Sequence, residues 1–275
     1  MRRNTELAMR LATDRAYDNS AAFPDVPQWR QVWRERSQAV AVVEPARLDI
    51  SYGRGSLQRL DVFPCADRNA ATAIFVHGGF WSRNSKETFR FLVRGIHAAG
   101  LNAIFLGHTL APNARMDEIV AEVRSAVQWI FMRLDKLGLS ARPLVMIGWS
   151  SGAQLAAMAM AADFVGAGIG IGGVYDLEDI RQASINDVLQ LDRDEALRSS
   201  ATITLPLRSG PFVVAYGAGE LPAFRVQSER FYKARLAATL PSELLALPGR
   251  HHHSALEELY EPAGLLTRVL TNLAA

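Results

Sequence analysis

Residues 143–162 read PLVMIGWSSGAQLAAMAMAA, and this stretch contains the patterns of a strand, a tight turn and a helix in that order. Between the apolar strand and the alanine-rich helix, Gly148-Trp149-Ser150-Ser151-Gly152 matches G-x-S-x-G. In that pattern a sharp strand-to-helix turn exposes the serine hydroxyl, and the flanking glycines relieve the crowding. Ser150 is therefore the candidate nucleophile. The alternative is a glycine-rich turn that carries an inert serine.

Short apolar runs alternate with helical patterns on both sides of this turn. Residues 48–52 and 60–63 form a hairpin pattern. Further strands are expected at 71–76, 103–106, 144–147, 165–171, 212–216 and 243–247, and the clearest helices at 116–137 and 151–162. This alternation predicts a mostly parallel sheet with helices on both faces. Together with the serine turn it predicts the α/β-hydrolase fold, with the active-site groups at the carboxyl ends of the strands.

The chain has no internal repeat, low-complexity tract or flexible linker, so we expect one domain over residues 1–275. Residues 1–44 are expected to form a helical N-terminal arm, because Trp29, Val32 and Trp33 recur at helical spacing.

Composition excludes several classes of function. The 30 basic and 28 acidic residues are interspersed and leave a formal charge of +2, which argues against nucleic acid as a partner. The single cysteine, Cys65, excludes an internal disulfide framework. The most apolar stretch, residues 164–174, is shorter than the ~20 residues of a membrane span. With no signal-peptide pattern, we expect a cytoplasmic protein with a small-molecule substrate and no membrane partner; a homodimer is left open.

A glycine loop follows the strand at 71–76 and reads His77-Gly78-Gly79-Phe80-Trp81. Acyl transfer requires N–H donors aimed at the oxyanion of the tetrahedral intermediate. The backbone N–H groups of Gly79, Phe80 and Ser151 are the expected donors. His77 precedes the serine in the chain, so we expect it to orient the loop instead of acting as the base. The alternative is a plain glycine turn.

The base and the acid should follow the serine in this fold. The run from Arg250 to Ser254 contains three histidines and lies after the last strand, where the base is expected. Neighbouring side chains on an extended loop diverge, so we expect no metal at these histidines. Glu220 follows the strand at 212–216 and can orient the base, whereas Asp176 is the competing acid. Otherwise Glu220 is a solvated loop residue or a charge at a helix N-terminus.

The motifs together resemble the kynurenine formamidases and the arylformamidase-like esterases over nearly the whole chain. The resemblance rests on 77–81, 148–152, 173–177, Glu220 with Phe224, Gln227 and Ser228, and 249–252. It implies that His252 is the catalytic histidine and that Glu220 is the triad acid. It also implies that residues 175–210 form a cap-like segment near the acyl pocket. The implied activity is hydrolysis of a small carboxylic ester or amide through an acyl-enzyme, without a cofactor.

Several residues depart from that family near the pocket. Trp149 and Ser151 stand where histidine and alanine are usual, Gln154 replaces a histidine, and His108 replaces a tyrosine. We expect Trp81, Trp149 and Asp176 at the substrate pocket, which should favour short acyl groups. Carbamate or other short-chain ester hydrolysis, metal-assisted hydrolysis at the histidine run and a catalytically silent binding module remain alternatives.

Overall fold

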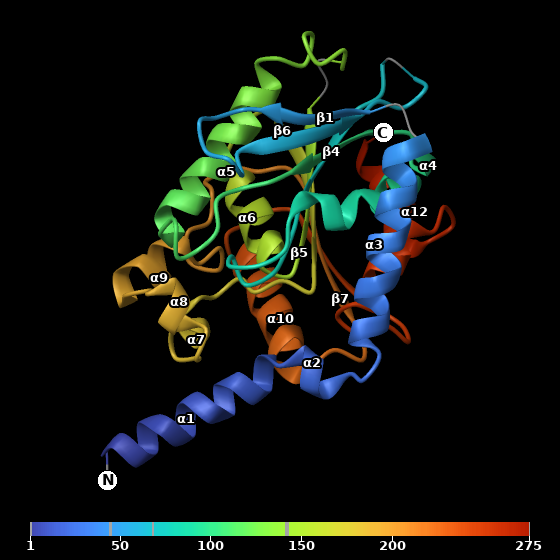
Figure 1. The fold of residues 1–275 in the computed structure, drawn as a ribbon. Helices are drawn as coiled ribbons and strands as arrows, with labels where there is room; N and C mark the ends of the chain where they lie inside the picture. Colours follow the sequence, from blue (N-terminus) through green and yellow to red (C-terminus); the bar gives the residue numbers. More distant parts are fainter. Residues whose placement is uncertain (1, 44–45, 68, 141–142, 275) are drawn as a thin grey trace.

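A computed structural model describes residues 2–43, 46–67, 69–140 and 143–274. One eight-stranded sheet runs through the molecule in the order β1-β2-β4-β3-β5-β6-β7-β8 (Figure 1). The strands are β1 (Arg47–Ser51), β2 (Arg59–Phe63), β3 (Thr72–Val76), β4 (Asn102–Leu106), β5 (Leu144–Trp149), β6 (Val165–Ile171), β7 (Phe212–Gly217) and β8 (Ser242–Leu247). The β1–β2 hairpin joins β4 antiparallel, and all the remaining pairs are parallel. The predicted mostly parallel sheet with an N-terminal hairpin is confirmed.

Helices cover both faces of this sheet (Figure 1). The helical elements are α1 (Arg2–Tyr17), α2 (Asn19–Ala22), α3 (Val26–Val43), η1 (Lys86–Leu92), α4 (Val93–Ala98), α5 (Met116–Phe131), α6 (Ser151–Ala159), α7 (Glu178–Arg181), α8 (Asn186–Leu189), α9 (Arg193–Ser199), α10 (Pro222–Ala237), η2 (Ser254–Leu256), α11 (Glu257–Tyr260) and α12 (Leu265–Ala274). Helices α5, α6 and α10 pack on one face, while α3, α4, α11 and α12 pack on the other.

The two helical layers explain why the central strands are apolar throughout. In β3, Ile74 and Val76 face the α5–α6 layer, whereas Ala73 and Phe75 face the layer that contains α3 and α4. Burial of a large apolar side chain contributes about 1.5–3 kcal/mol, so both sets stabilise the sheet. The carboxyl ends of β3, β5, β6 and β7 consequently meet at one edge, where the loops that carry the candidate site begin.

Two predicted helices end earlier than expected. The helix at 116–137 ends at Phe131, and turns lead from there to Gly138, whose positive φ of 72° is incompatible with a continuing helix. The helix at 151–162 ends at Ala159, because the chain must turn back to enter β6. Helical composition therefore continued past the real helix ends in both cases.

Helices α1, α2 and α3 precede the first strand and form the N-terminal arm. Helix α1 points away from the body of the molecule, while α3 runs along one side (Figure 1), where Trp33 stacks on Phe91 of η1 at 5.7 Å. At the end of α1, the Tyr17 ring packs on Phe224 of α10 at 5.3 Å between centroids. None of the described helices combines the length and the apolar character of a membrane span.

Candidate active site

Ser150 lies in the sharp turn between β5 and α6. Its backbone has φ 57° and ψ −125°, an unusual conformation that costs on the order of 1–3 kcal/mol. A Cβ on Gly148 would lie 2.2 Å from the Gly152 carbonyl oxygen, and one on Gly152 would lie 2.2 Å from the Val76 carbonyl oxygen. Both glycines of the motif are thus required by close backbone contacts, and the serine side chain is directed to a cavity that it lines.

The glycine loop (residues 77–84) crosses directly beside this turn. A Cβ on Gly78 would lie 2.5 Å from the Trp149 carbonyl oxygen, so the two backbones are in contact. Gly79 and Phe80 line the same cavity as Ser150. Within the described residues, the backbone N–H groups of Gly79, Phe80 and Ser151 donate to no protein acceptor. These three N–H groups remain available to a negatively charged oxygen.

Hydrogen bonds hold the glycine loop in shape. The Gly78 carbonyl accepts from His77 Nδ1 at 3.0 Å and from Asn84 Nδ2 at 3.0 Å. Burial, together with the stacked His108 ring 4.5 Å away, lowers the pKa of His77 to about 3. His77 is therefore neutral at pH 7 and makes the orienting contact that its position in the chain indicated.

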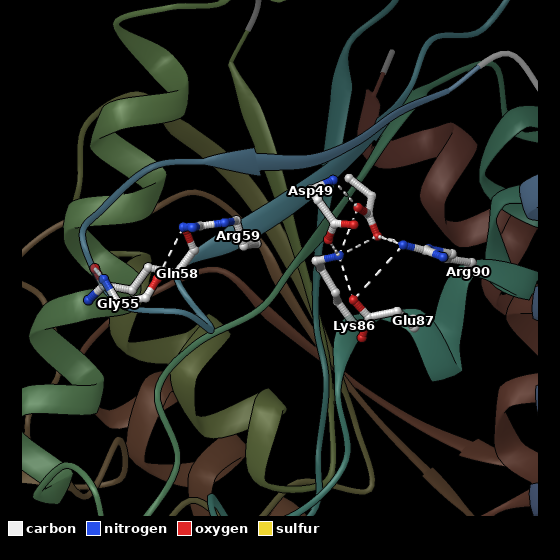
Figure 2. A network of polar contacts seen from close by, with 8 residues as sticks. Asp49, Gly55, Gln58, Arg59, Lys86, Glu87 and Arg90 are labelled. Carbon is white, nitrogen blue, oxygen red and sulfur yellow. Dashed lines mark hydrogen bonds and ion pairs between the residues drawn. The ribbon is translucent and has the colours of Figure 1, made fainter.

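A buried ion-pair cluster secures the segment that follows the glycine loop (Figure 2). The Lys86 ammonium, in a side chain only 4% exposed, lies 2.7 Å from Asp49, 2.8 Å from Asp61 and 2.6 Å from Glu87. Arg90 also pairs with Asp61, at 2.8 Å. Burial opposes the charge, but the hydrogen bonds to the three carboxylates raise the pKa of Lys86 above its ordinary value. This Lys86 cluster fixes η1 to the β1–β2 hairpin.

His252 and Glu220 meet behind the cavity. The Glu220 side chain is fully buried after β7, and its Oε1 lies 3.5 Å from His252 Nδ1. That separation exceeds a good hydrogen bond, and His252 Nδ1 and Glu220 Oε2 have no other partner among the described residues. Trp149 Nε1 donates to the His252 carbonyl at 2.9 Å, which fixes the histidine backbone. His252 itself lines the cavity together with Ser150.

The other two histidines of the run have partners of their own, although His253 also lines the cavity. His251 Nε2 lies 3.0 Å from the Asp25 carboxylate, and the His251 ring stacks on Phe23 at 4.5 Å. His253 stacks on Trp33 of α3 at 5.4 Å, and burial lowers the pKa of His253 to about 2. The His253 ring centroid lies 5.6 Å from that of His252 and 6.4 Å from that of His251. Over the described ranges, no three His, Cys, Asp or Glu side chains are grouped so that they could hold a metal ion.

The cavity has a volume of about 700 Å³ and opens between the sheet edge and the N-terminal arm. Its walls come from the arm, the glycine loop, the serine turn, the cap-like segment and the histidine run. They comprise Asp14, Tyr17, Asp18, Asn19, Ser20, Arg30, Arg34, Gly79, Phe80, Arg83, Asn84, Trp149, Ser150, Ile180, Ala183, Ser184, Ile185, Val188, His252 and His253. The expected pocket residue Trp149 is among them.

Two residues expected at the pocket do not line the cavity. Trp81 is only 1% exposed and has a positive φ of 53°. Its indole is buried and donates to Gln154 at 2.9 Å. Asp176 uses its carboxylate to accept from the Glu178 backbone N–H at 3.0 Å. Of the three expected pocket residues, this cavity is thus lined by Trp149 and by neither Trp81 nor Asp176. The structure also brings Glu220, not Asp176, to His252.

The sequence interpretation missed the charged wall of the cavity. Arg30, Arg34 and Arg83 form no ion pair with any described residue. The acidic wall residues accept hydrogen bonds from neutral groups. Asp14 accepts from the backbone N–H and hydroxyl of Ser184 in the cap-like segment, and Asp18 accepts from the Ala21 backbone N–H in α2. The spacing of Arg30 and Arg34, four residues apart, places them on one helix face but does not indicate what that face contacts.

Known proteins match this chain over most of its length. The BD-FAE family model matches residues 60–166. The kynurenine formamidase of Salmo salar is 30% identical over 243 residues, which cover 82% of this chain and 81% of that protein. The kynurenine formamidase of Danio rerio is 28% identical over 241 residues, with the same two shares.

Solved structures share the fold. A candidate thioesterase from a Silicibacter species superposes with a TM-score of 0.85 at 24% identity, covering 94% of this chain and 98% of that one. The expected α/β-hydrolase fold and the resemblance to kynurenine formamidases are both confirmed. The chain therefore belongs to the kynurenine formamidase family, and it is an α/β-hydrolase that acts on ester or amide bonds.

Proposed function

We propose that the protein is an arylformamidase-type serine hydrolase with Ser150, His252 and Glu220 as its catalytic triad. The observation that carries this proposal is that Ser150 and His252 line one cavity while Glu220 lies directly behind His252. Catalytic hydrogen bonds are often long in an enzyme without substrate, so a separation of 3.5 Å is compatible with the role.

The reaction begins when Ser150 Oγ attacks the substrate carbonyl carbon and its proton moves to His252 Nε2. The backbone N–H groups of Gly79, Phe80 and Ser151 stabilise the oxyanion of the tetrahedral intermediate. His252 then protonates the leaving amine or alcohol as its bond to carbon breaks, which leaves an acyl group on Ser150. Water attacks that acyl group with His252 again as the base, which releases the acid and restores the serine. Glu220 stabilises the His252 imidazolium during both acylation and deacylation.

The substrate that the cavity favours is a short-acyl amide of an aromatic amine that carries a carboxylate. The curated relatives are named kynurenine formamidases, and N-formylkynurenine has this chemistry. Three arginines without ion-pair partners face the cavity and complement an anionic leaving group. Phe80 and Trp149 supply aromatic contact surface near the serine.

A substrate panel tests the proposal. We expect turnover of N-formylkynurenine and p-nitrophenyl acetate, with much slower turnover of p-nitrophenyl octanoate and aryl carbamates. Ser150→Ala should lose at least ~10⁴-fold in kcat while keeping its melting temperature. A preference for octanoyl esters or carbamates would overturn the proposed substrate, and a folded Ser150→Ala variant with more than about a tenth of wild-type activity would overturn the mechanism.

A labelling experiment separates an active enzyme from a catalytically silent module. Only a serine activated by a paired base reacts readily with a phosphonyl or sulfonyl fluoride. We expect peptide mapping to find one adduct, on Ser150. An adduct on Ser151, or no adduct at all, would contradict the assigned nucleophile.

A further inference from the structure

One buried glutamine joins three separate parts of the site. Gln154 lies four residues after Ser150 on α6 and is 0% exposed. Its Oε1 accepts from Trp81 Nε1 at 2.9 Å, and its Nε2 donates to the Ser199 carbonyl at 2.7 Å. The amide therefore connects the glycine loop, the nucleophile helix and the end of α9 through two well-formed hydrogen bonds.

The glycine loop requires such an anchor because its backbone is strained. Phe80 and Trp81 have φ of 49° and 53°, and each costs on the order of 1–2 kcal/mol in a non-glycine residue. Three contacts oppose relaxation of this turn. The Trp81 indole binds Gln154, the Trp81 carbonyl accepts from Ala111 N–H at 2.9 Å, and the Trp81 N–H lies 3.4 Å from Ser151 Oγ. Two of these contacts depend on side chains of α6, and the shorter of the two is the indole contact with Gln154.

The other end of the glutamine contacts the segment that roofs the cavity. Ser199 is the last residue of α9, and its hydroxyl donates to Asp117 at 3.1 Å. Ile180, Ile185 and Val188, earlier in the same segment, line the cavity. Gln154 does not line the cavity and so does not contact a substrate bound there.

We infer that Gln154 is a positioning residue, which holds Trp81 so that the adjoining Phe80 N–H stays directed at the oxyanion. This inference rests on the proposed serine mechanism. Because the oxyanion develops only in the transition state, misplacement of its donor lowers kcat and leaves substrate binding nearly unchanged. A role confined to packing would lower stability without this separation of kcat from KM.

A double-mutant cycle tests the inference with p-nitrophenyl acetate as the substrate. Gln154→Met removes both hydrogen bonds at similar volume, and Trp81→Phe removes the indole donor together with part of the buried ring. We expect each variant to lose about 10- to 100-fold in kcat, with KM within about threefold of wild type. Since both changes break the same contact, the double variant should lose no more than about threefold beyond the worse single variant. Fully multiplicative losses, or a kcat within about twofold of wild type in both single variants, would overturn the inference.

A conservative variant supplies a rescue. In Gln154→Glu a neutral carboxyl can accept from Trp81 and donate to the Ser199 carbonyl, whereas the ionised form cannot donate. Burial keeps a carboxyl neutral to higher pH. The kcat of Gln154→Glu relative to wild type should therefore be highest near pH 6 and fall as the pH rises. A ratio as low as that of Gln154→Met at every pH would contradict the hydrogen-bonding role.

Two controls distinguish the ways in which the test can fail. Asn102 is a similarly buried amide, bonded to the Cys65 N–H at 2.9 Å at the opposite edge of the sheet. Asn102→Leu should lower the melting temperature and keep wild-type kcat, and an equal loss of kcat there would overturn a specific role for Gln154. If Ser150→Ala stays active, the serine mechanism itself fails. If Ser150→Ala is inactive but Gln154→Met keeps wild-type kcat, the serine mechanism stands and the positioning role of Gln154 is wrong.

Discussion

Substitution of Gly172 by alanine places one methyl group against the contact between Glu220 and His252. Gly172 follows β6 with φ 54°, and an added Cβ would lie 2.6 Å from Glu220 Oε1 and 2.8 Å from His252 Nδ1. Ordinary contact begins near 3.4 Å, so the two atoms must retreat by about 0.6–0.8 Å. Glu220 and His252, the proposed acid and base, are then separated further and cannot form a hydrogen bond with each other.

The expected loss follows from that displacement. Misplacement of a catalytic group by ~1 Å costs on the order of 10²-fold in rate, so we expect kcat of Gly172→Ala to fall by about 50- to 100-fold. KM should change little, because Gly172 does not line the cavity. Steady-state kinetics with N-formylkynurenine or p-nitrophenyl acetate measures both constants.

Gly138→Ala is the matched control. Gly138 has φ 72° and no atom within 4 Å of an added Cβ, so alanine meets the same backbone strain with no steric conflict. Each variant should lose about 1–2 kcal/mol of unfolding free energy from the backbone alone. If the kcat of Gly172→Ala lies within threefold of that of Gly138→Ala, the reasoning about the Glu220–His252 contact is refuted.

Three further predictions concern the histidine run and the Lys86 cluster. We expect His252→Ala to lose about 10⁴-fold in kcat, whereas His251→Ala and His253→Ala should keep at least about a tenth of the wild-type kcat. Equal losses of kcat in the three variants would contradict the proposed triad. Lys86→Met leaves the fully buried Asp61 carboxylate with one cation fewer, so chemical denaturation should report a loss of about 3 kcal/mol, and a loss below ~1 kcal/mol would be inconsistent with this. Burial holds the pKa of His253 at about 2 against 6.5 when exposed, so unfolding takes up a proton as pH falls below about 6.5. This histidine therefore lowers the free energy of unfolding by about 1.4 kcal/mol for each pH unit between about pH 6.5 and about pH 2. In His253→Phe the free energy of unfolding should fall with decreasing pH less steeply by that amount. If urea titrations give the same slope for the variant and the wild type, this prediction is wrong.

Local patterns were sufficient to predict the sheet and the order of the candidate site residues. Strand boundaries differ from the expected ones by at most two residues, because apolar runs buried on both faces are bounded by polar or glycine residues. Ser150, Glu220 and His252 each follow a strand of the parallel sheet, so the topology alone places their loops at one edge. Their chain order was thus informative about their proximity.

Side-chain direction within the loops was harder to predict. Two consecutive positive φ angles at Phe80 and Trp81 turn the indole into the core, and no rule of spacing indicates such a turn in non-glycine residues. The arginine wall was missed for a different reason. Arg30 and Arg34 reach the cavity only because α3 docks across the sheet edge through long-range contacts such as Trp33 with His253. The sequence offers no local signal for that docking.

The histidine run, which holds the proposed base, stacks on the N-terminal arm, so we expect activity to appear late in folding. Asp25 and His251 touch although they are 226 positions apart, and Trp33 must reach His253 over a similar span. Contacts between residues so far apart in the chain form slowly, because closing the long loop between them costs conformational entropy before the contacts contribute stability. During synthesis the arm leaves the ribosome long before the histidine run exists, so under the proposed mechanism a growing chain lacks its base, His252, and we expect it to be inactive. Reaction with a serine-directed fluorophosphonate would therefore serve as a clock for the last stage of folding.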